Sequence, residues 1–165
     1  DNTSVAARIS ESDFRIKRVL VEKVFPSNLN VILEKRKAMV GIAVENGVFL
    51  IDSEGMVIAF EKTSTLPVLY GLKSDMVVGE RASQEVVNAA RILSLVNKAQ
   101  SANTAYLEED SVRVNLANDI SSYFSLDSDV ESRVGALQLI LSRIKMDEKL
   151  PKTIDLRYSK PILNY

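Results

Sequence analysis

The sequence predicts an α+β fold: a mainly antiparallel sheet with two helices on one face, preceded by a smaller amino-terminal part. Three observations support this prediction. Short segments that alternate apolar and polar residues, bounded by turn residues, are typical of half-buried strands. Two longer stretches repeat apolar residues at spacings of four and three, as one face of a helix does. The strands also come in runs with helices between the runs, which is the order expected of this class.

The first 38 residues predict a helical turn followed by a hairpin. The stretch 1–14 has helical character, with Val5, Ile9 and Phe14 as its apolar positions. Residues 15–25 are rich in β-branched side chains, and residues 29–37 alternate between apolar and polar. The connection "PSN" (26–28) consists of turn formers, so the two strands are expected to pair.

A strand meander is expected next. "MVGIAV" (39–44) and "VFLID" (48–52) are joined through Asn46-Gly47, a dipeptide that suits a type I′ hairpin turn. After the turn "SEG" (53–55), "MVIAF" (56–60) forms a third strand. We expect "STLPVLYGLK" (64–73) to be a loop, because Pro67 and Gly71 interrupt it.

Two helices are predicted, near residues 81–99 and 129–145, with three short strands between them in 104–126. Each helix has a single apolar stripe, and a stripe of this kind needs one surface to cover it. Ser128 and Glu131 fit a capping box at the start of the second helix. The two stripes consist of Ala82, Val86, Ala89, Leu93 and Val96, and of Val130, Val134, Leu137, Leu141 and Ile144.

The last residues, "TIDLRYSKPILNY" (153–165), also predict a strand. Ile154, Leu156 and Tyr158 fall on one face of the alternation, and a second apolar run follows Pro161. A strand at the edge of a sheet exposes a row of unpaired N–H and C=O groups, which is normally blunted. An alternating, aromatic edge therefore suits a protein that pairs it with a partner.

Composition excludes several classes of function. The 165 residues carry 21 basic and 22 acidic side chains, and this balance disfavours nucleic-acid binding. The absence of Cys and His excludes thiol catalysis, a Ser-His-Asp triad and most zinc sites. No apolar run reaches the roughly 20 residues that span a bilayer, so we expect any membrane anchor to lie outside this segment.

Three charged clusters have structural explanations that we prefer to chemical ones. "DSDVE" (127–131) lacks the Gly and Glu of a calcium loop and fits a helix cap. "EED" (108–110) is expected at a solvated hairpin tip rather than as a catalytic pair. "EKRK" (34–37) is expected at a solvated edge or junction rather than at a phosphate site. We therefore expect no enzyme, no cofactor and no metal.

Four motifs in order resemble the FtsQ/DivIB family of bacterial cell-division proteins. "VLVEKVFPSNLNVILEK" resembles the closing hairpin of that family's POTRA domain, and "FLIDSEGMV" its ID-x-x-G turn. "LPVLYG" and "IDLRY" resemble its LP-x-hydrophobic-x-G loop and its terminal-strand signature. The resemblance covers roughly residues 14–165. Lys37 stands where the family often has Pro, which predicts a less stiff interdomain joint.

The resemblance implies a domain division: the carboxyl-terminal part of a POTRA domain over 1–38 and the family's β domain over 39–165. It also implies a non-enzymatic divisome scaffold, anchored in the inner or plasma membrane, facing outward at the septum. The implied partners are bitopic coiled-coil division proteins of the FtsB/DivIC and FtsL type, taken up by strand addition at the carboxyl-terminal edge. The implied partner-binding residues are Arg157, Tyr158, Ser159, Lys160, Ile162 and Leu163.

Two other functions stay open from the sequence. A POTRA-type chaperone or translocation module would also use an open edge, to bind extended clients, and tandem repeats would support it. A wall-active enzyme would bind a small substrate in a pocket that contains a carboxylate with a perturbed pKa.

Overall fold

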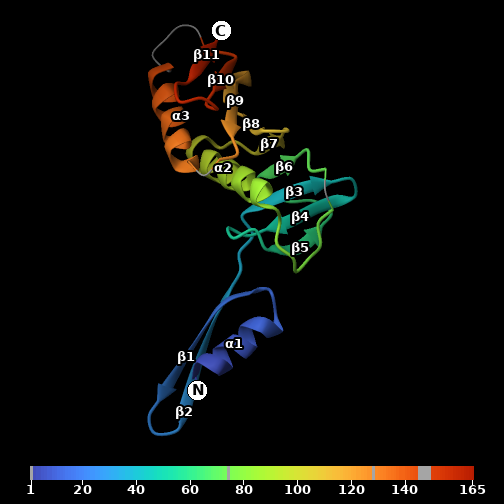
Figure 1. The fold of residues 1–165 in the computed structure, drawn as a ribbon, viewed down its shortest axis with the longest axis vertical. Coiled ribbons are helices and arrows are strands. Elements are labelled where there is room, and N and C mark those ends of the chain that lie inside the picture. Colours follow the sequence, from blue (N-terminus) through green and yellow to red (C-terminus); the bar gives the residue numbers. More distant parts are fainter. Residues whose placement is uncertain (1, 74, 128, 145–149) are drawn as a thin grey trace.

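The computed structural model describes residues 2–73, 75–127, 129–144 and 150–165. These residues form a two-stranded sheet and a nine-stranded sheet. Figure 1 shows the small sheet with one helix at one end of the long axis, and the large sheet with two helices at the other. The expected α+β class is confirmed, because helices and mainly antiparallel strands form separate runs along the chain.

The amino-terminal part consists of α1 (Asn2–Ser12), β1 (Ile16–Val24) and β2 (Asn28–Lys35). β1 and β2 pair antiparallel, with Val21 opposite Val31. α1 packs against β1, so one face of the hairpin is partly covered. The helical segment and the hairpin expected from the sequence are both present. The domain boundary between residues 38 and 39 stays a prediction.

The large sheet has the strand order β11-β10-β9-β8-β7-β6-β3-β4-β5. Five of its strand pairs are antiparallel. The other three are parallel. The predicted mainly antiparallel sheet is therefore confirmed, as two meanders that meet at a central strand. Its strands are β3 (Val40–Val44), β4 (Gly47–Ile51), β5 (Val57–Glu61), β6 (Val68–Tyr70), β7 (Thr104–Leu107), β8 (Ser111–Asn115), β9 (Ser121–Ser125), β10 (Thr153–Asp155) and β11 (Ile162–Asn164).

The central strand β6 corrects the prediction of a loop over 64–73. Its three residues lie between β3 and β7 and run parallel to both. Leu69 is fully buried, although the strand is too short to produce a periodic signal in the sequence. Pro67 and Gly71 bracket β6 instead of excluding it. Gly71 has a φ of +91°, and a Cβ there would lie 2.5 Å from the backbone oxygen of Leu107.

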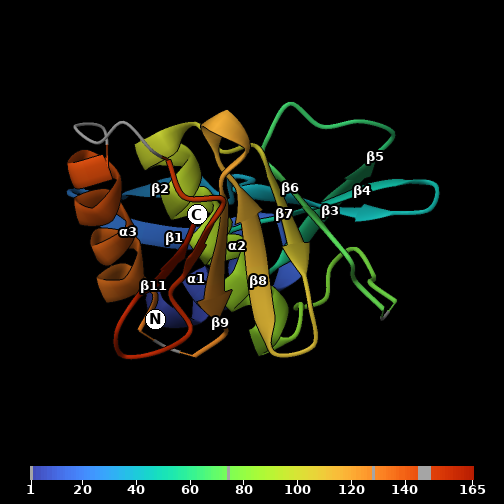
Figure 2. The same ribbon diagram turned by 90° about the horizontal axis from the view of Figure 1, so that it is seen from above.

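The two long helices are α2 (Gln84–Gln100) and α3 (Val130–Ile144), as the stripes predict. Ser83 caps α2 by accepting a hydrogen bond from the N–H of Val86. Both stripes lie in one core with the sheet, except for Ala82, which precedes α2 and is half-buried. Ser128, and with it the predicted capping box, lies outside the described residues. Figure 2 places α3 beside the end of the sheet that contains β9 and β11.

The carboxyl-terminal strand is shorter than the alternation predicts. β10 ends at Asp155, Leu156 still donates its N–H to Tyr123, and the chain then bends through residues 157–160. Ile154 and Leu156 are buried, but Tyr158 is 57% exposed. Tyr158 therefore does not share the buried face with Ile154 and Leu156, because it lies after the strand. The run after Pro161 forms β11, which covers the outer side of β10.

Candidate partner-binding edge

The large sheet has two edge strands, β5 and β11, and in the described chain only the start of β5 has a backbone partner on its outer side. Val57 of β5 donates its N–H to Glu80 and accepts a hydrogen bond from Gly79. Met56 forms an isolated bridge with Arg81 beside it. β11 pairs with β10 on one side, and no strand of the described chain lies on its other side.

The backbone of Leu163 faces this outer side. Leu156 donates its N–H to Tyr123, and Lys152 accepts from the N–H of Ser121, so the even-numbered residues of β10 are directed toward β9. Thr153 and Asp155 therefore face β11, because alternate residues of a strand serve opposite neighbours. Their partners are Asn164 and Ile162. Leu163 lies between these two, so its N–H and C=O are directed away from the sheet.

The predicted site residues lie around this edge in two groups. Arg157, Tyr158, Ser159 and Lys160 lie in the exposed bends that link β10 to β11. Ile162 and Leu163 lie in β11; Ile162 is 47% exposed, and Leu163 is partly buried against the core. The structure thus brings all six to one end of the sheet. Their role in binding stays a prediction.

Asp155, which the sequence prediction missed, holds Arg157 in place. Its carboxylate accepts hydrogen bonds from Nε and Nη2 of Arg157, the shorter at 2.6 Å, and one from the Arg157 N–H. The hydrogen bonds from Arg157 lower the pKa of Asp155, against the opposing effect of its partial burial. The guanidinium lies 5.4 Å from the ring centre of Tyr123 and 5.8 Å from that of Tyr158. Tyr158 therefore stands next to a fixed cation.

An aromatic and arginine row crosses the sheet toward the same edge. On the face opposite the helices, the strand register places side chains next to one another from β6 to β11. The first two rings are stacked 5.3 Å apart, and the guanidinium of Arg113 lies 4.4 Å from the second ring. The neighbouring row on this face is mainly polar. The row consists of Tyr70, Tyr106, Arg113, Tyr123, Asp155 and Ile162, and its neighbour of Val68, Thr104, Asn115, Ser121, Thr153 and Asn164.

The amino-acid sequence alone does not indicate this row. The alternation in "TAYLEED", "SVRVNLA" and "DISSYFSL" indicates which residues share a face within each strand. It does not indicate the register between strands, and only the register aligns Tyr106, Arg113 and Tyr123. The sequence does not indicate the parallel neighbour Tyr70 either, because Pro67 and Gly71 predict a loop at that place.

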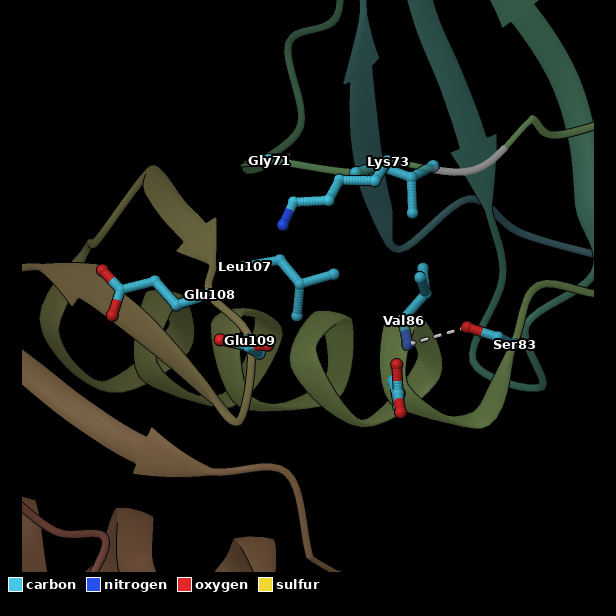
Figure 3. A pocket seen from close by; sticks show the side chains of 9 residues that line it. Gly71, Lys73, Ser83, Val86, Leu107, Glu108 and Glu109 are labelled. Carbon is cyan, nitrogen blue, oxygen red and sulfur yellow. Dashed lines mark hydrogen bonds between the residues drawn. The ribbon is translucent and has the colours of Figure 1, made fainter.

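A pocket of about 430 Å³ opens near the carboxyl ends of β6 and β7. Figure 3 shows Lys73 and Leu107 directed into it, with Ser83 and Val86 from the start of α2 on its far side. Glu108 lies at its rim and is paired with Arg113 at 3.2 Å. The "EED" cluster forms the turn between β7 and β8, as predicted, because the N–H of Glu108 bonds to Ser111. In the described part of the chain, no acidic cluster could hold a metal ion.

The "EKRK" cluster lies at the junction of the two sheets, as predicted. Arg36 donates from Nη1 to Asp52 at 2.5 Å and to Glu54 at 2.8 Å. It also donates from Nε to the carbonyl of Phe14. Burial opposes the charge of Arg36, but the hydrogen bonds to Glu54 and Asp52 outweigh this and raise its pKa. Asp52 is 2% exposed and also accepts from the N–H groups of Glu54 and Met56.

The chain was compared with known proteins. Its residues 42–157 match the family model described as "Cell division protein FtsQ/DivIB, C-terminal". No curated protein sequence matches significantly. The solved structure of the major extracytoplasmic domain of the trans isomer of the cell-division protein DivIB from Geobacillus stearothermophilus is similar. It overlaps 70% of this chain and 99% of its own, at 15% sequence identity and a TM-score of 0.48.

The family match covers more than two thirds of the 165 residues and includes the large sheet from Ile42 in β3 to the end of β10. It ends before Tyr158 and β11. No helix in the described residues is both long and apolar enough to cross a membrane. The role indicated by the match is in cell division, and the chain belongs to the FtsQ/DivIB family of bacterial cell-division proteins.

Proposed function

We propose that this chain is part of a non-enzymatic divisome scaffold that binds bitopic division proteins of the FtsB/DivIC and FtsL type by strand addition at β11. The scaffold is anchored in the inner or plasma membrane and faces outward at the septum. Membership of the FtsQ/DivIB family supports the role in division. The open outer side of β11 is the observation that supports strand addition.

Main-chain pairing supplies the affinity in this proposal. An added strand takes up the outward N–H and C=O of Leu163, which face no other strand of the described chain. A three-residue strand offers few such groups, so the side chains at the edge must contribute as well. Tyr158 and Ile162 are half-exposed apolar groups beside the edge and are suited to this.

The row on the open face supports specificity. A partner strand beside β11 places one of its side chains next to Ile162, in line with Asp155 and Tyr123. Its side chains two residues away lie on the same face. Tyr and Arg are enriched among residues that dominate binding energies, and Arg157 is already held by Asp155. Lys160 at the exposed rim contributes only about 0–1 kcal/mol if it pairs with an acidic partner residue.

One observation favours the alternative, a POTRA-type module that binds extended clients. β2 pairs only with β1, and Leu29, Val31 and Leu33 of β2 are all exposed. A client strand could pair there. The described chain contains one such hairpin and no tandem copy, so the scaffold remains the preferred proposal.

The main-chain part of the proposal is tested by Leu163→Pro. Proline removes the outward N–H and places its ring where the added strand would lie. We expect pull-down of the coiled-coil partners to be lost while the thermal midpoint is kept. Leu163→Ala is the matched control: it shortens the side chain but keeps the N–H, and it should retain binding. If Leu163→Pro stays folded and binds normally, strand addition at β11 is wrong.

The side-chain part is tested by Tyr158→Ala. The ring is 57% exposed, so its loss should leave the domain folded. We expect binding to weaken by about 2 kcal/mol or more, the scale of a dominant interface residue. Leu139→Ala, at a 67% exposed position on α3, is the control and should leave binding unchanged. Equal binding by both variants would place the partner site elsewhere.

A further inference from the structure

The tip of the β1–β2 hairpin exposes a concentrated apolar group. Phe25 is 94% exposed, the highest value among the exposed large hydrophobic residues of the described chain. Val24 and Leu29 beside it are 48% and 56% exposed. With Pro26, they border a hollow at the end of the hairpin. The fold therefore removes almost none of the surface of the Phe25 side chain from water.

A tight connection does not require these residues. Turns favour Gly, Pro, Asn, Asp and Ser, and Pro26, Ser27 and Asn28 already supply that chemistry. Phe25, directly before them, is not one of these turn formers, and its side chain adds exposed apolar area. Exposed apolar groups of this kind mark a contact with another molecule or with a membrane.

The position of the tip favours a membrane. The tip lies at one extreme of the long axis, away from the large sheet and from β11 (Figure 1). α1 leads into β1 through the short link 13–15 and packs back along it, so the start of α1 points toward the tip. The proposed scaffold is anchored through a segment outside this chain, and we take that segment to come before α1. The chain before α1 then approaches the module from the side of the tip.

The chemistry of the tip fits the bilayer interface. Segments that lie in the membrane interface bury Phe, Trp and Leu side chains at the boundary between the headgroups and the acyl chains. Lys23 adjoins the apolar tip, and its long stem lets the ammonium reach lipid phosphates. An anchored protein holds its own tip at a high effective concentration near the membrane, so a small apolar tip is sufficient.

We propose that the tip formed by Val24, Phe25, Pro26 and Leu29 inserts into the headgroup region of the membrane that anchors the protein. This inference rests on the anchored, outward-facing topology proposed above. The inserted tip adds a second contact with the bilayer, besides the anchor. Because the tip and β11 lie at opposite ends of the long axis (Figure 1), the module then extends away from the membrane surface, with β11 at its far end.

The test uses Phe25→Trp, because the chain contains no other tryptophan. The protein is held through an amino-terminal histidine tag on vesicles of equal parts phosphatidylglycerol and phosphatidylethanolamine that contain nickel-chelating lipid. We expect the tryptophan emission to shift to shorter wavelength on tethering and to be quenched by brominated acyl chains. Leu139→Trp, on exposed α3, is the matched control and should show neither change.

Unchanged tryptophan emission from the tethered, folded Phe25→Trp variant would overturn the proposal. A shift that appears only when a partner protein is added would also overturn it, since the tip would then contact protein. The assay contains no division partner and changes no residue near β11. Its failure is therefore distinct from failure of strand addition, which the pull-down measures.

Discussion

The two regions of this chain use apolar residues in opposite ways. Every buried hydrophobic residue of the described chain lies between Val40 and Leu156. The hairpin region before it leaves most of its large apolar side chains exposed, including all four on β2. Both regions contain alternating strands, but only the large sheet has two helices over its face. Alternation therefore indicates which face can be buried, and a second layer decides whether it is.

The joint between the regions is polar. Arg36 reaches from the end of the hairpin to Asp52 and Glu54 in the turn between β4 and β5. Lys17 and Arg81 also approach Glu54, at 4.0 and 3.8 Å. The described residues of the hairpin region thus form no hydrophobic core of their own but have a specific ionic attachment, despite Lys37 in place of a stiffening Pro.

Hydrogen exchange should give the largest difference between the regions. The amides of β1 and β2 should exchange far faster than those of β3, β7 and β8. Opening the hairpin exposes little new apolar surface, whereas the central strands open only with most of the core. Mass spectrometry after timed labelling measures this directly. Slower exchange in the hairpin than in the central sheet would contradict the comparison.

Truncation of one Leu in each region should give the next largest difference. Leu137 on α3 is fully buried, and Leu137→Ala should cost about 2–5 kcal/mol of unfolding free energy. Leu33 on β2 is 49% exposed, and Leu33→Ala should cost about 1 kcal/mol or less. Denaturant midpoints compare the two variants. The reverse order would mean that the hairpin contains the more important core.

The joint is tested by Arg36→Ala against Arg15→Ala. Arg36→Ala leaves the buried carboxylate of Asp52 without its cation and should cost about 3 kcal/mol of unfolding free energy. The cost stays at the low end for a broken buried ion pair, because two backbone N–H groups still bond to that carboxylate. Arg15 pairs with Asp13 at the surface, and its removal should cost about 0–1 kcal/mol. Thermal midpoints and exchange rates of β1 and β2 provide the measurement. Equal effects would show that the joint does not depend on Arg36.

The sequence predicts most reliably those elements whose structure depends only on neighbouring residues in the chain. The stripes of α2 and α3, the hairpin around Pro26 and the turn at Asn46-Gly47 follow from local spacing, and each is present. The sequence does not predict β6, because its three residues are held in a strand by pairing with the parallel strands β3 and β7, which are distant in the sequence. The row from Tyr70 to Ile162 depends on register across six strands, and Tyr158 leaves the buried face because the chain bends after Leu156.

Acid should separate two similar Asp-x-Arg pairs, one in each region. Asp13 binds Arg15, and Asp155 binds Arg157, through the same pattern of hydrogen bonds. The hydrogen bonds from Arg15 lower the pKa of Asp13 to about 2, and those from Arg157 lower the pKa of Asp155. Both carboxylates have a lower pKa in the folded state, so both stabilise it above the unfolded pKa, about 3.9.

This stabilisation is lost as the pH falls through the folded-state pKa. Asp155 is part of the large sheet, so we expect Asp155→Asn to reduce the fall in thermal midpoint between pH 5 and pH 2, and Asp13→Asn to change it less. Added salt should weaken the exposed Asp13 pair more. A larger effect from Asp13→Asn would assign the acid-sensitive contact to the hairpin region.

Glu131 should give the smallest effect, although the capping box predicted from the sequence assigns it a role worth about 0.5–2 kcal/mol. In the structure Glu131 forms an ion pair with Arg91, which links α3 to α2 across the surface. The two side chains are 58% and 52% exposed, so water and salt screen the pair. Glu131→Ala should therefore cost about 0–1 kcal/mol, and a double-mutant cycle with Arg91→Ala measures how much of it belongs to the pair. A cost near 2 kcal/mol that survives in the Arg91→Ala background would mean that Glu131 stabilises the start of α3 itself, as the capping prediction requires.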